Sequence, residues 1–147
     1  ATAVGFGTFT GTTSITASQS IAVGTNASQG YTAKIMENSL LTNPSLETIA
    51  DYGGATDGVA GSAWTESTTT GFGVCASGGH AFETNYDDGD PSWLYMAITS
   101  GSAKTVAYHD SSVVDTTTYV QYRVAVPSNQ AAGLYTTLVN YFVVPMY

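Results

Sequence analysis

The last third of the chain shows the clearest alternation of apolar and polar positions. Between residues 119 and 126 the apolar side chains fall on every second position, at Val120, Tyr122, Val124 and Val126. One apolar side in a period-two pattern predicts a half-buried antiparallel strand. Pro127 then removes a backbone donor, and turn-forming residues fill 128–133. We therefore expect a strand over 119–126 that ends in a turn.

A second strand is predicted over residues 134–144, which are rich in β-branched and aromatic side chains. Both of its faces are apolar, with Leu138, Phe142 and Val144 on one and Tyr135, Val139, Tyr141 and Val143 on the other. Such a strand needs a cover on each face, from its own domain or from a neighbour. Together the two strands predict a C-terminal hairpin that Pro145 closes.

The first eleven residues alternate differently. Glycine occupies positions 5, 7 and 11 on one face, Val4 and Phe6 lie on the other, and Phe9 interrupts the glycine face. Glycine inside a strand costs entropy and often marks the close approach of another backbone. Two interpretations stay open. The segment is either the domain's own first strand with a bulge, or a donor strand that completes the sheet of a neighbouring copy.

Shorter apolar runs punctuate the rest of the chain. We expect strands within 12–29, 30–36, 71–76, 93–98 and 105–108, and either one helical turn or a pinned loop over 45–52. Turn residues separate these runs at a spacing of about 8–12 residues, which is typical of all-β domains. The sequence predicts a single antiparallel β-sandwich of Greek-key or jelly-roll type over residues 12–147. An N-terminal extension over residues 1–11 precedes it.

Charged residues make up only 10% of the 147 positions, against about 25% in an average domain. Three are basic and eleven acidic, so the net charge is −8. Nucleic acids and anionic lipids require a basic surface, so neither is an expected partner. The chain starts at Ala1 without methionine, and we expect a mature N-terminus left by an export signal, with a fragment boundary as the alternative. The expected location is extracellular, at the cell surface, with no membrane insertion.

Two residues are candidates for covalent modification, a cysteine and an asparagine. Cys75 is the only cysteine, so no intramolecular disulfide is expected. We expect a buried thiol, with an intermolecular bridge or a reactive thiol as alternatives. Asn26 opens an N-glycosylation sequon, a pattern that also arises often by chance.

An acidic segment is the candidate metal site. Asp87, Asp88 and Asp90 offer side-chain oxygens beside a glycine, which suits calcium. Their spacing does not match an EF-hand loop, and a solvated loop is the alternative. His80 and His109 stand in no recognised zinc motif, and no other cofactor is expected.

The sequence carries no recognised catalytic motif, and we expect that the chain is not an enzyme. It has no G-x-S-x-G elbow, and Glu66 with Glu83 indicates no glycosidase without a geometry to support the pair. Trp64, Trp93 and the tyrosines fit either a sugar-binding platform or an ordinary aromatic core.

Three short motifs resemble those of exported bacterial β-sandwich proteins. Residues 130–135 (QAAGLY) are similar to their Q-x-A-G-x-Y turn, and residues 26–31 (NASQGY) to their N-A-x-x-G-Y turn. Residues 64–72 are similar to their run of a tryptophan, a Thr/Ser stretch and a Gly-Phe-Gly. Such proteins include surface filament subunits of the kind found in TasA-like matrix fibres, chaperone–usher-type pili and archaeal bundling pili. The resemblance implies a sandwich whose N-terminal strand leaves its own domain. Type IV pilins are not expected, since the N-terminal hydrophobic helix of that class is missing here.

The resulting hypothesis is a secreted subunit of a homopolymeric filament, a pilus or matrix fibre. The donor strand is residues 1–11, whose apolar side chains Val4, Phe6 and Phe9 fill a neighbour's acceptor groove. That groove is expected along the last strand, near Leu138, Tyr141 and Phe142.

The partners of such a subunit are other copies of the chain, with surface glycans or neighbouring filaments as further contacts. The alternative hypothesis is a secreted carbohydrate-binding or adhesive module, in which Trp64 and Trp93 contact the sugar.

Overall fold

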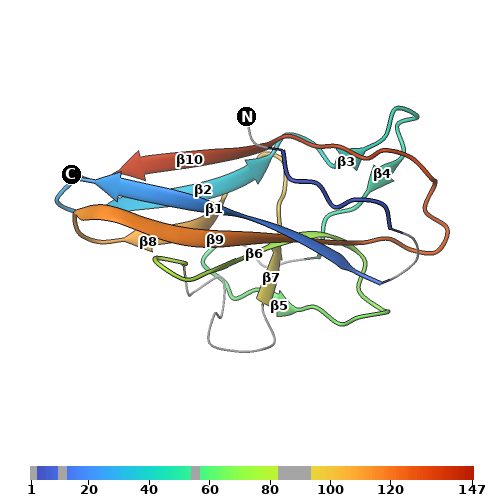
Figure 1. The fold of residues 1–147 in the computed structure, drawn as a ribbon, viewed down its shortest axis with the longest axis horizontal. Coiled ribbons are helices and arrows are strands. Elements are labelled where there is room, and N and C mark those ends of the chain that lie inside the picture. The colour runs from blue at the N-terminus through green and yellow to red at the C-terminus, as the bar shows by residue number, and fades with distance from the viewer. Residues whose placement is uncertain (1–2, 10–12, 54–56, 83–93) are drawn as a thin grey trace.

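The fold is taken from a computed structural model, which describes residues 3–9, 13–53, 57–82 and 94–147 (Figure 1). The strands of these ranges form antiparallel sheets, and no described residue is helical. The predicted all-β class is therefore confirmed. It follows that no helix in the described ranges could span a membrane.

The larger sheet has five strands in the order β1-β9-β6-β7-β5. Their bounds are Ile15–Thr25 for β1, Val113–Ala125 for β9, Gly71–Ser77 for β6, Leu94–Ala97 for β7 and Ser62–Ala63 for β5. β9 lies between β1 and β6 and pairs with both, so neither of its edges is free.

The smaller sheet has three strands in the order β10-β2-β8. Their bounds are Val139–Pro145 for β10, Tyr31–Glu37 for β2 and Lys104–His109 for β8. A separate pair joins β3, Leu41–Thr42, to β4, Thr48–Ile49.

The five-stranded and three-stranded sheets share one hydrophobic core. On β2 the alternation is strict, because Tyr31, Ala33 and Ile35 are fully buried and the residues between them are not. Val120 and Val124 of β9 reach the same core from the larger sheet. Burying one such side chain contributes about 1.5–3 kcal/mol, so this shared interior holds the two sheets together.

The predicted burial of Cys75 is also confirmed, since only 1% of the residue is exposed. It lies on β6 and forms no disulfide. The described fold is therefore held together without a disulfide bond.

The expected C-terminal hairpin is wrong. β9 and β10 belong to different sheets, and residues 126–138 cross from one sheet to the other. The physical reason is that β1 and β6 occupy both edges of β9, so β10 has to pair elsewhere, with β2. The last strand also begins at Val139, later than expected, and residues 134–138 before it make a single bridge, between Thr136 and Thr42.

Residues 45–52 form no helical turn; they are a loop that contains the short strand β4. Ile49 and Tyr52 are buried, whereas Leu46 points outward with 82% of its surface exposed. Leu46 also has a φ of 65°, which a helix does not allow. The helical alternative is therefore wrong, and the loop alternative holds for Ile49 and Tyr52 but not for Leu46.

Candidate strand-acceptor seam

β1 and β10 are edge strands that flank the same opening of the core. β1 ends the five-stranded sheet, β10 ends the three-stranded sheet, and no described segment pairs with either outer edge. The two strands run in the same direction in Figure 1. A free edge presents unpaired N–H and C=O groups and is a template for a further strand. We call the strip between these two edges the seam.

Side chains that face the seam are less covered than the rest of the core. On β1, Ile15, Ala17 and Ile21 are only half-buried, although they alternate with the outward positions. On β10, Val143 is 49% exposed, whereas Ile35 on the adjacent strand β2 is fully buried. The core is therefore open along the line between β1 and β10.

A polar link crosses the middle of the seam. The Gln19 amide of β1 donates hydrogen bonds to the hydroxyl of Tyr141 on β10 at 2.6 Å and to that of Tyr122 on β9 at 3.1 Å. The two hydroxyls are themselves 2.6 Å apart. Burial raises the pKa of Tyr141, so its hydroxyl keeps its proton and the link persists at neutral pH. These bonds join the two sheets where their strands do not pair.

At one end the seam widens into a cavity of about 650 Å³. Its lining comes from both edges and from the adjoining turns, and includes Val23, Asn26, Val113, Val143 and Tyr147. Asn26, the predicted glycosylation residue, is exposed in the turn after β1 and stands at this cavity. The opening is lined mainly by apolar side chains and holds no charged one among those residues.

The chain's own N-terminal segment lies against the core near the other end of the seam. Val4, Phe6 and Phe9 are partly buried against the core, and the Phe6 ring meets Phe72 edge-on at 6.1 Å. In the register of the large sheet, Phe72 stands beside Val124, which stands beside the first residue of β1. Residues 3–9 form no strand and make no backbone hydrogen bond to a described residue. Among the described residues, side-chain contacts alone hold the segment.

The glycine face of this segment does not lie in a tight groove of its own chain. A β-carbon at Gly5 or Gly7 would meet no atom within 4 Å. Gly7 has a φ of +72°, a conformation that favours glycine, and this explains that residue locally. The close backbone approach expected from the sequence is therefore not found at Gly5 or Gly7 within one copy, and Gly11 lies outside the described residues.

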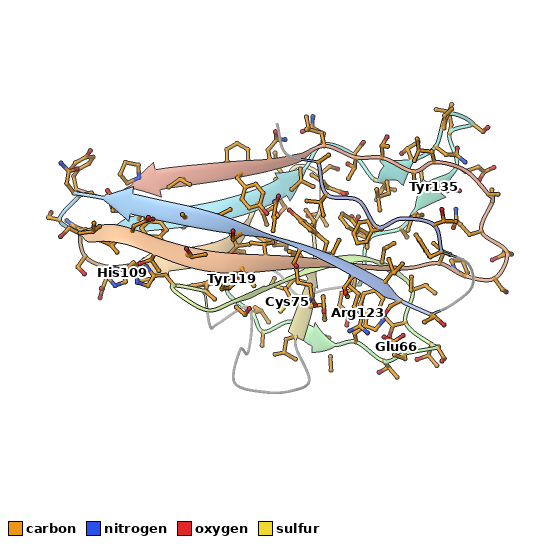
Figure 2. All side chains as sticks on the ribbon, in the orientation of Figure 1. Glu66, Cys75, His109, Tyr119, Arg123 and Tyr135 are labelled. Carbon is orange, nitrogen blue, oxygen red and sulfur yellow. The ribbon has the colours of Figure 1, made fainter. Side chains whose placement is uncertain are left out.

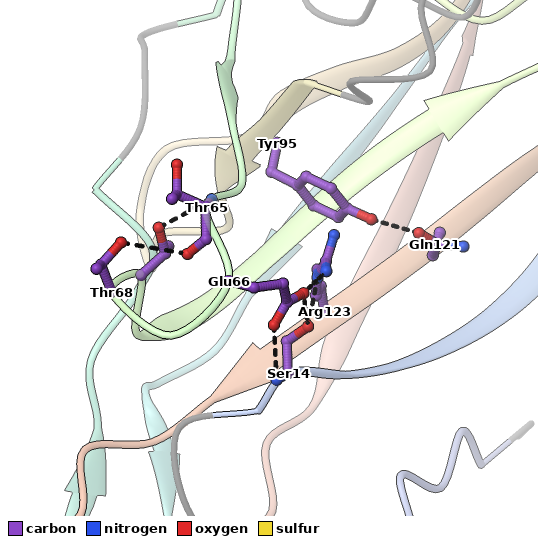
Figure 3. Close-up of polar contacts among 8 residues, drawn as sticks. Ser14, Thr65, Glu66, Thr68, Tyr95, Gln121 and Arg123 are labelled. Atoms are coloured by element: carbon purple, nitrogen blue, oxygen red, sulfur yellow. Dashed lines mark hydrogen bonds and ion pairs between the residues drawn. The ribbon is translucent and has the colours of Figure 1, made fainter.

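An ionic cluster anchors the base of the segment just before β1 (Figure 3). Glu66 accepts hydrogen bonds from the backbone N–H of Ser14 at 3.2 Å and from its hydroxyl at 2.6 Å. Arg123 of β9 pairs with Glu66 and donates to the Ser14 hydroxyl at 2.8 Å. The Arg123 guanidinium also lies over the rings of Trp64 and Tyr95, at 5.1 and 5.3 Å from their centres. The cluster fixes the point at which β1 begins.

The predicted acceptor residues separate onto two surfaces. Tyr141 faces the seam, as its bonds to Gln19 and Tyr122 show. Phe142 lies on the opposite face of β10, beside Lys34, and is 42% exposed. Leu138 precedes the strand and is 59% exposed. Sequence reasoning missed the β1 side of the seam, because only the sheet order reveals that β1 is an edge.

The structure gives little support to the other predicted sites. Asp87, Asp88, Asp90 and Trp93 lie outside the described residues. Within the described ranges, no three His, Cys, Asp or Glu side chains come together. Trp64 is partly buried, with Tyr52 stacked on it at 5.0 Å and Arg123 over its ring, so its aromatic surface is already engaged by protein.

Two pairings of ionisable groups were not foreseen from the sequence. The rings of His80 and His109 stack with their centres 3.8 Å apart. Glu37, at the end of β2, is 1% exposed, and its carboxylate oxygens accept no hydrogen bond in the described structure. Burial, and then the neighbouring Asp51, raise the pKa of Glu37 to about 8. A protonated Glu37 can donate to Asp51, whose own pKa is raised by burial.

Charge is distributed unevenly along the chain. Every Asp, Glu, Lys and Arg lies between Lys34 and Arg123, so β1, β10 and the N-terminal segment carry no charged side chain.

No protein-family model, no curated protein and no solved structure matched this chain.

Proposed function

We propose that the chain is a structural subunit of an extracellular homopolymeric filament, in which residues 1–11 of one copy enter the seam of the next. In this proposal the two sheets form a sandwich that the donated strand completes. The observation that carries it is the pair of unpaired, parallel edges of β1 and β10 on either side of an incompletely covered apolar core. Strand addition at a sheet edge is a common mode of protein association.

Additional backbone hydrogen bonds would favour, in free energy, insertion of the segment into another copy over its packing within its own copy. Within one copy, residues 3–9 contact the other described residues only through side chains and form no backbone hydrogen bond to the edges of β1 or β10. A strand inserted between those edges gains such bonds, each worth about 0.5–1.5 kcal/mol net. Packing within one copy has the advantage of a high effective concentration. Polymerisation therefore depends on the additional hydrogen bonds.

The charge distribution favours the same surfaces. Copies with a net charge of −8 repel one another wherever their acidic regions meet. The donor segment and both seam edges have no charged side chain, so their contact buries no charge. The association is thus directed to the apolar seam by the exclusion of the charged surfaces.

Electron microscopy of the full chain beside a version that lacks residues 1–11 tests this function. We expect filaments from the full chain and monomers from the truncated one, since only the donor has been removed. Circular dichroism of the truncated chain serves as the control that its β structure persists. Monomers from the full chain under all conditions, including added calcium, would contradict the proposal, and filaments from both chains would move the contact to another surface.

A further inference from the structure

The stacked histidines lie apart from the seam and have a chemistry of their own. His80 belongs to the turn after β6, and His109 ends β8 at one end of the molecule (Figure 2). Their ring planes differ by 16° and their centres are 3.8 Å apart. They are the only two histidines in the chain. Two imidazoles far apart in sequence are therefore held in contact by the fold.

One nitrogen of each ring is held by the protein. The Nδ1 of His80 lies 3.3 Å from the Tyr31 hydroxyl, and the Nδ1 of His109 lies 3.0 Å from the backbone carbonyl of Ser111. The Ser111 backbone nitrogen also lies 3.3 Å from this Nδ1, farther than the carbonyl oxygen. The shorter contact favours the tautomer in which Nδ1–H donates to the carbonyl, which leaves the lone pair of His109 on Nε2. Neither Nε2 has a hydrogen-bond partner among the described residues. Metal-binding histidines are typically oriented by a bond of this kind at the second nitrogen.

Both rings are only partly buried, so an ion can reach them from solvent. The other soft ligand of the chain, Cys75, is buried inside the sheet and does not compete.

We propose that His80 and His109 together bind one divalent transition-metal ion of the zinc, nickel or copper class through their Nε2 atoms. The ring centres are 3.8 Å apart, so the two side chains are near enough to share one ion, since zinc lies roughly 2.0 Å from each histidine nitrogen that binds it. Binding requires the side chains to rotate out of the stack, because imidazole lone pairs lie in the plane of the ring. Water completes the coordination, because no third protein ligand of the described residues stands beside the pair. This site does not depend on the proposed filament.

Calorimetric titration of the tag-free full chain with zinc chloride and with nickel chloride at pH 7.5 tests the site. We expect saturable binding of one ion per chain, with a rise in Tm on metal addition. His80→Ala and His109→Ala should each abolish both effects. Asp110→Asn is the matched control, since Asp110 is exposed beside His109 and should leave binding unchanged.

A second readout keeps the result clear if a variant is unstable. In the unaltered chain, the imidazole proton resonances of both histidines should shift or broaden together on addition of zinc. Metal binding that survives both alanine substitutions would overturn the proposal, because the ligands would then lie elsewhere. Failure of the unaltered chain to bind either metal below about 1 mM, a free energy weaker than about −4 kcal/mol, would also overturn it.

Discussion

At the scale of single residues, the carboxyl group of Glu37 is expected to contribute most to the pH dependence of the free energy of unfolding. Its side chain is buried beside another acid, Asp51, to which the carboxyl can donate a hydrogen bond only while it keeps its proton. An ionised pair in that position would be strongly destabilising, so the native fold retains a proton there. The folded pKa of about 8 against an unfolded value of 4.5 expresses this preference.

Glu37 should make the fold less stable as the pH rises. Because its folded pKa is raised, its contribution is fully present below pH 4.5 and is lost as the pH passes through about 8. We expect the free energy of unfolding to fall by about 1.4 kcal/mol between pH 7 and 9, most of it below pH 8, because the slope of at most about 1.4 kcal/mol per pH unit vanishes once the folded carboxyl has lost its proton. Glu37→Gln, a neutral mimic of the protonated acid, should remove most of this slope.

Urea unfolding at pH 7, 8 and 9 measures the effect. This window avoids the acid side, where the lowered pKa of His80 makes the fold lose stability as the pH falls below 6.5. Parallel stability curves for the unaltered chain and Glu37→Gln would show that Glu37 is ionised in the fold and would contradict the expectation.

Single-residue features differ in how far the sequence predicts them. The burial of Cys75 was predictable, because it lies within an apolar strand. The contact of His80 with His109 was not, since it depends on how the turn after β6 meets the end of β8. The pair of Glu37 and Asp51 leaves no signal for the same reason: neither residue stands in a motif, and only packing brings them together.

At the scale of elements, the two faces of β10 allow a test of the proposed acceptor site, because one face lines the seam and the other is an ordinary exposed surface. Val143 faces the cavity at the end of the seam, while Val144 lies on the opposite face, paired with Thr32. Their exposed fractions are similar, 49% and 55%. Lysine at either position should change the stability of the monomer by no more than about 0.5 kcal/mol, because both sites are open to water.

Val143→Lys should prevent filament formation, and Val144→Lys should not. An inward-pointing charge at a strand edge opposes the addition of a further apolar strand, because it would have to be desolvated. Light scattering and electron microscopy of the two variants give the comparison. Loss of assembly in Val144→Lys with normal assembly in Val143→Lys would place the contact on the outer face of the small sheet instead.

Strand positions were more predictable than strand partners. The alternation of β2 and the apolar run of β6 placed both strands within a residue or two of their observed bounds. The pairing of the last two strands was mispredicted, because a hairpin is the expected outcome only when the first strand has a free edge. β9 has none, since β1 pairs along one edge and β6 along the other.

At the scale of the whole molecule, the sequence predicted the all-β class but not the opening in the core. A low charge content, many turn residues and period-two alternation are local properties, and they determine the class. The seam depends on which strands end each sheet, which is a property of the complete topology. The absence of charged residues from both ends of the chain is visible in the sequence. Its relevance to assembly follows only from the fold, because the two uncharged regions supply the edges of one opening.

The central claim is that the seam accepts residues 1–11 of another copy, and peptide binding to the truncated chain tests it most directly. A labelled peptide of residues 1–11 would be titrated with the chain that lacks them and followed by fluorescence anisotropy. We predict saturable binding that a Phe6→Asp peptide loses, because the substitution would carry a charge into the apolar seam. Val143→Lys in the truncated chain should also abolish binding, whereas Val144→Lys on the opposite face of β10 should retain it. No binding of the unaltered peptide to a folded truncated chain, or equal binding by the two lysine variants, would contradict the account.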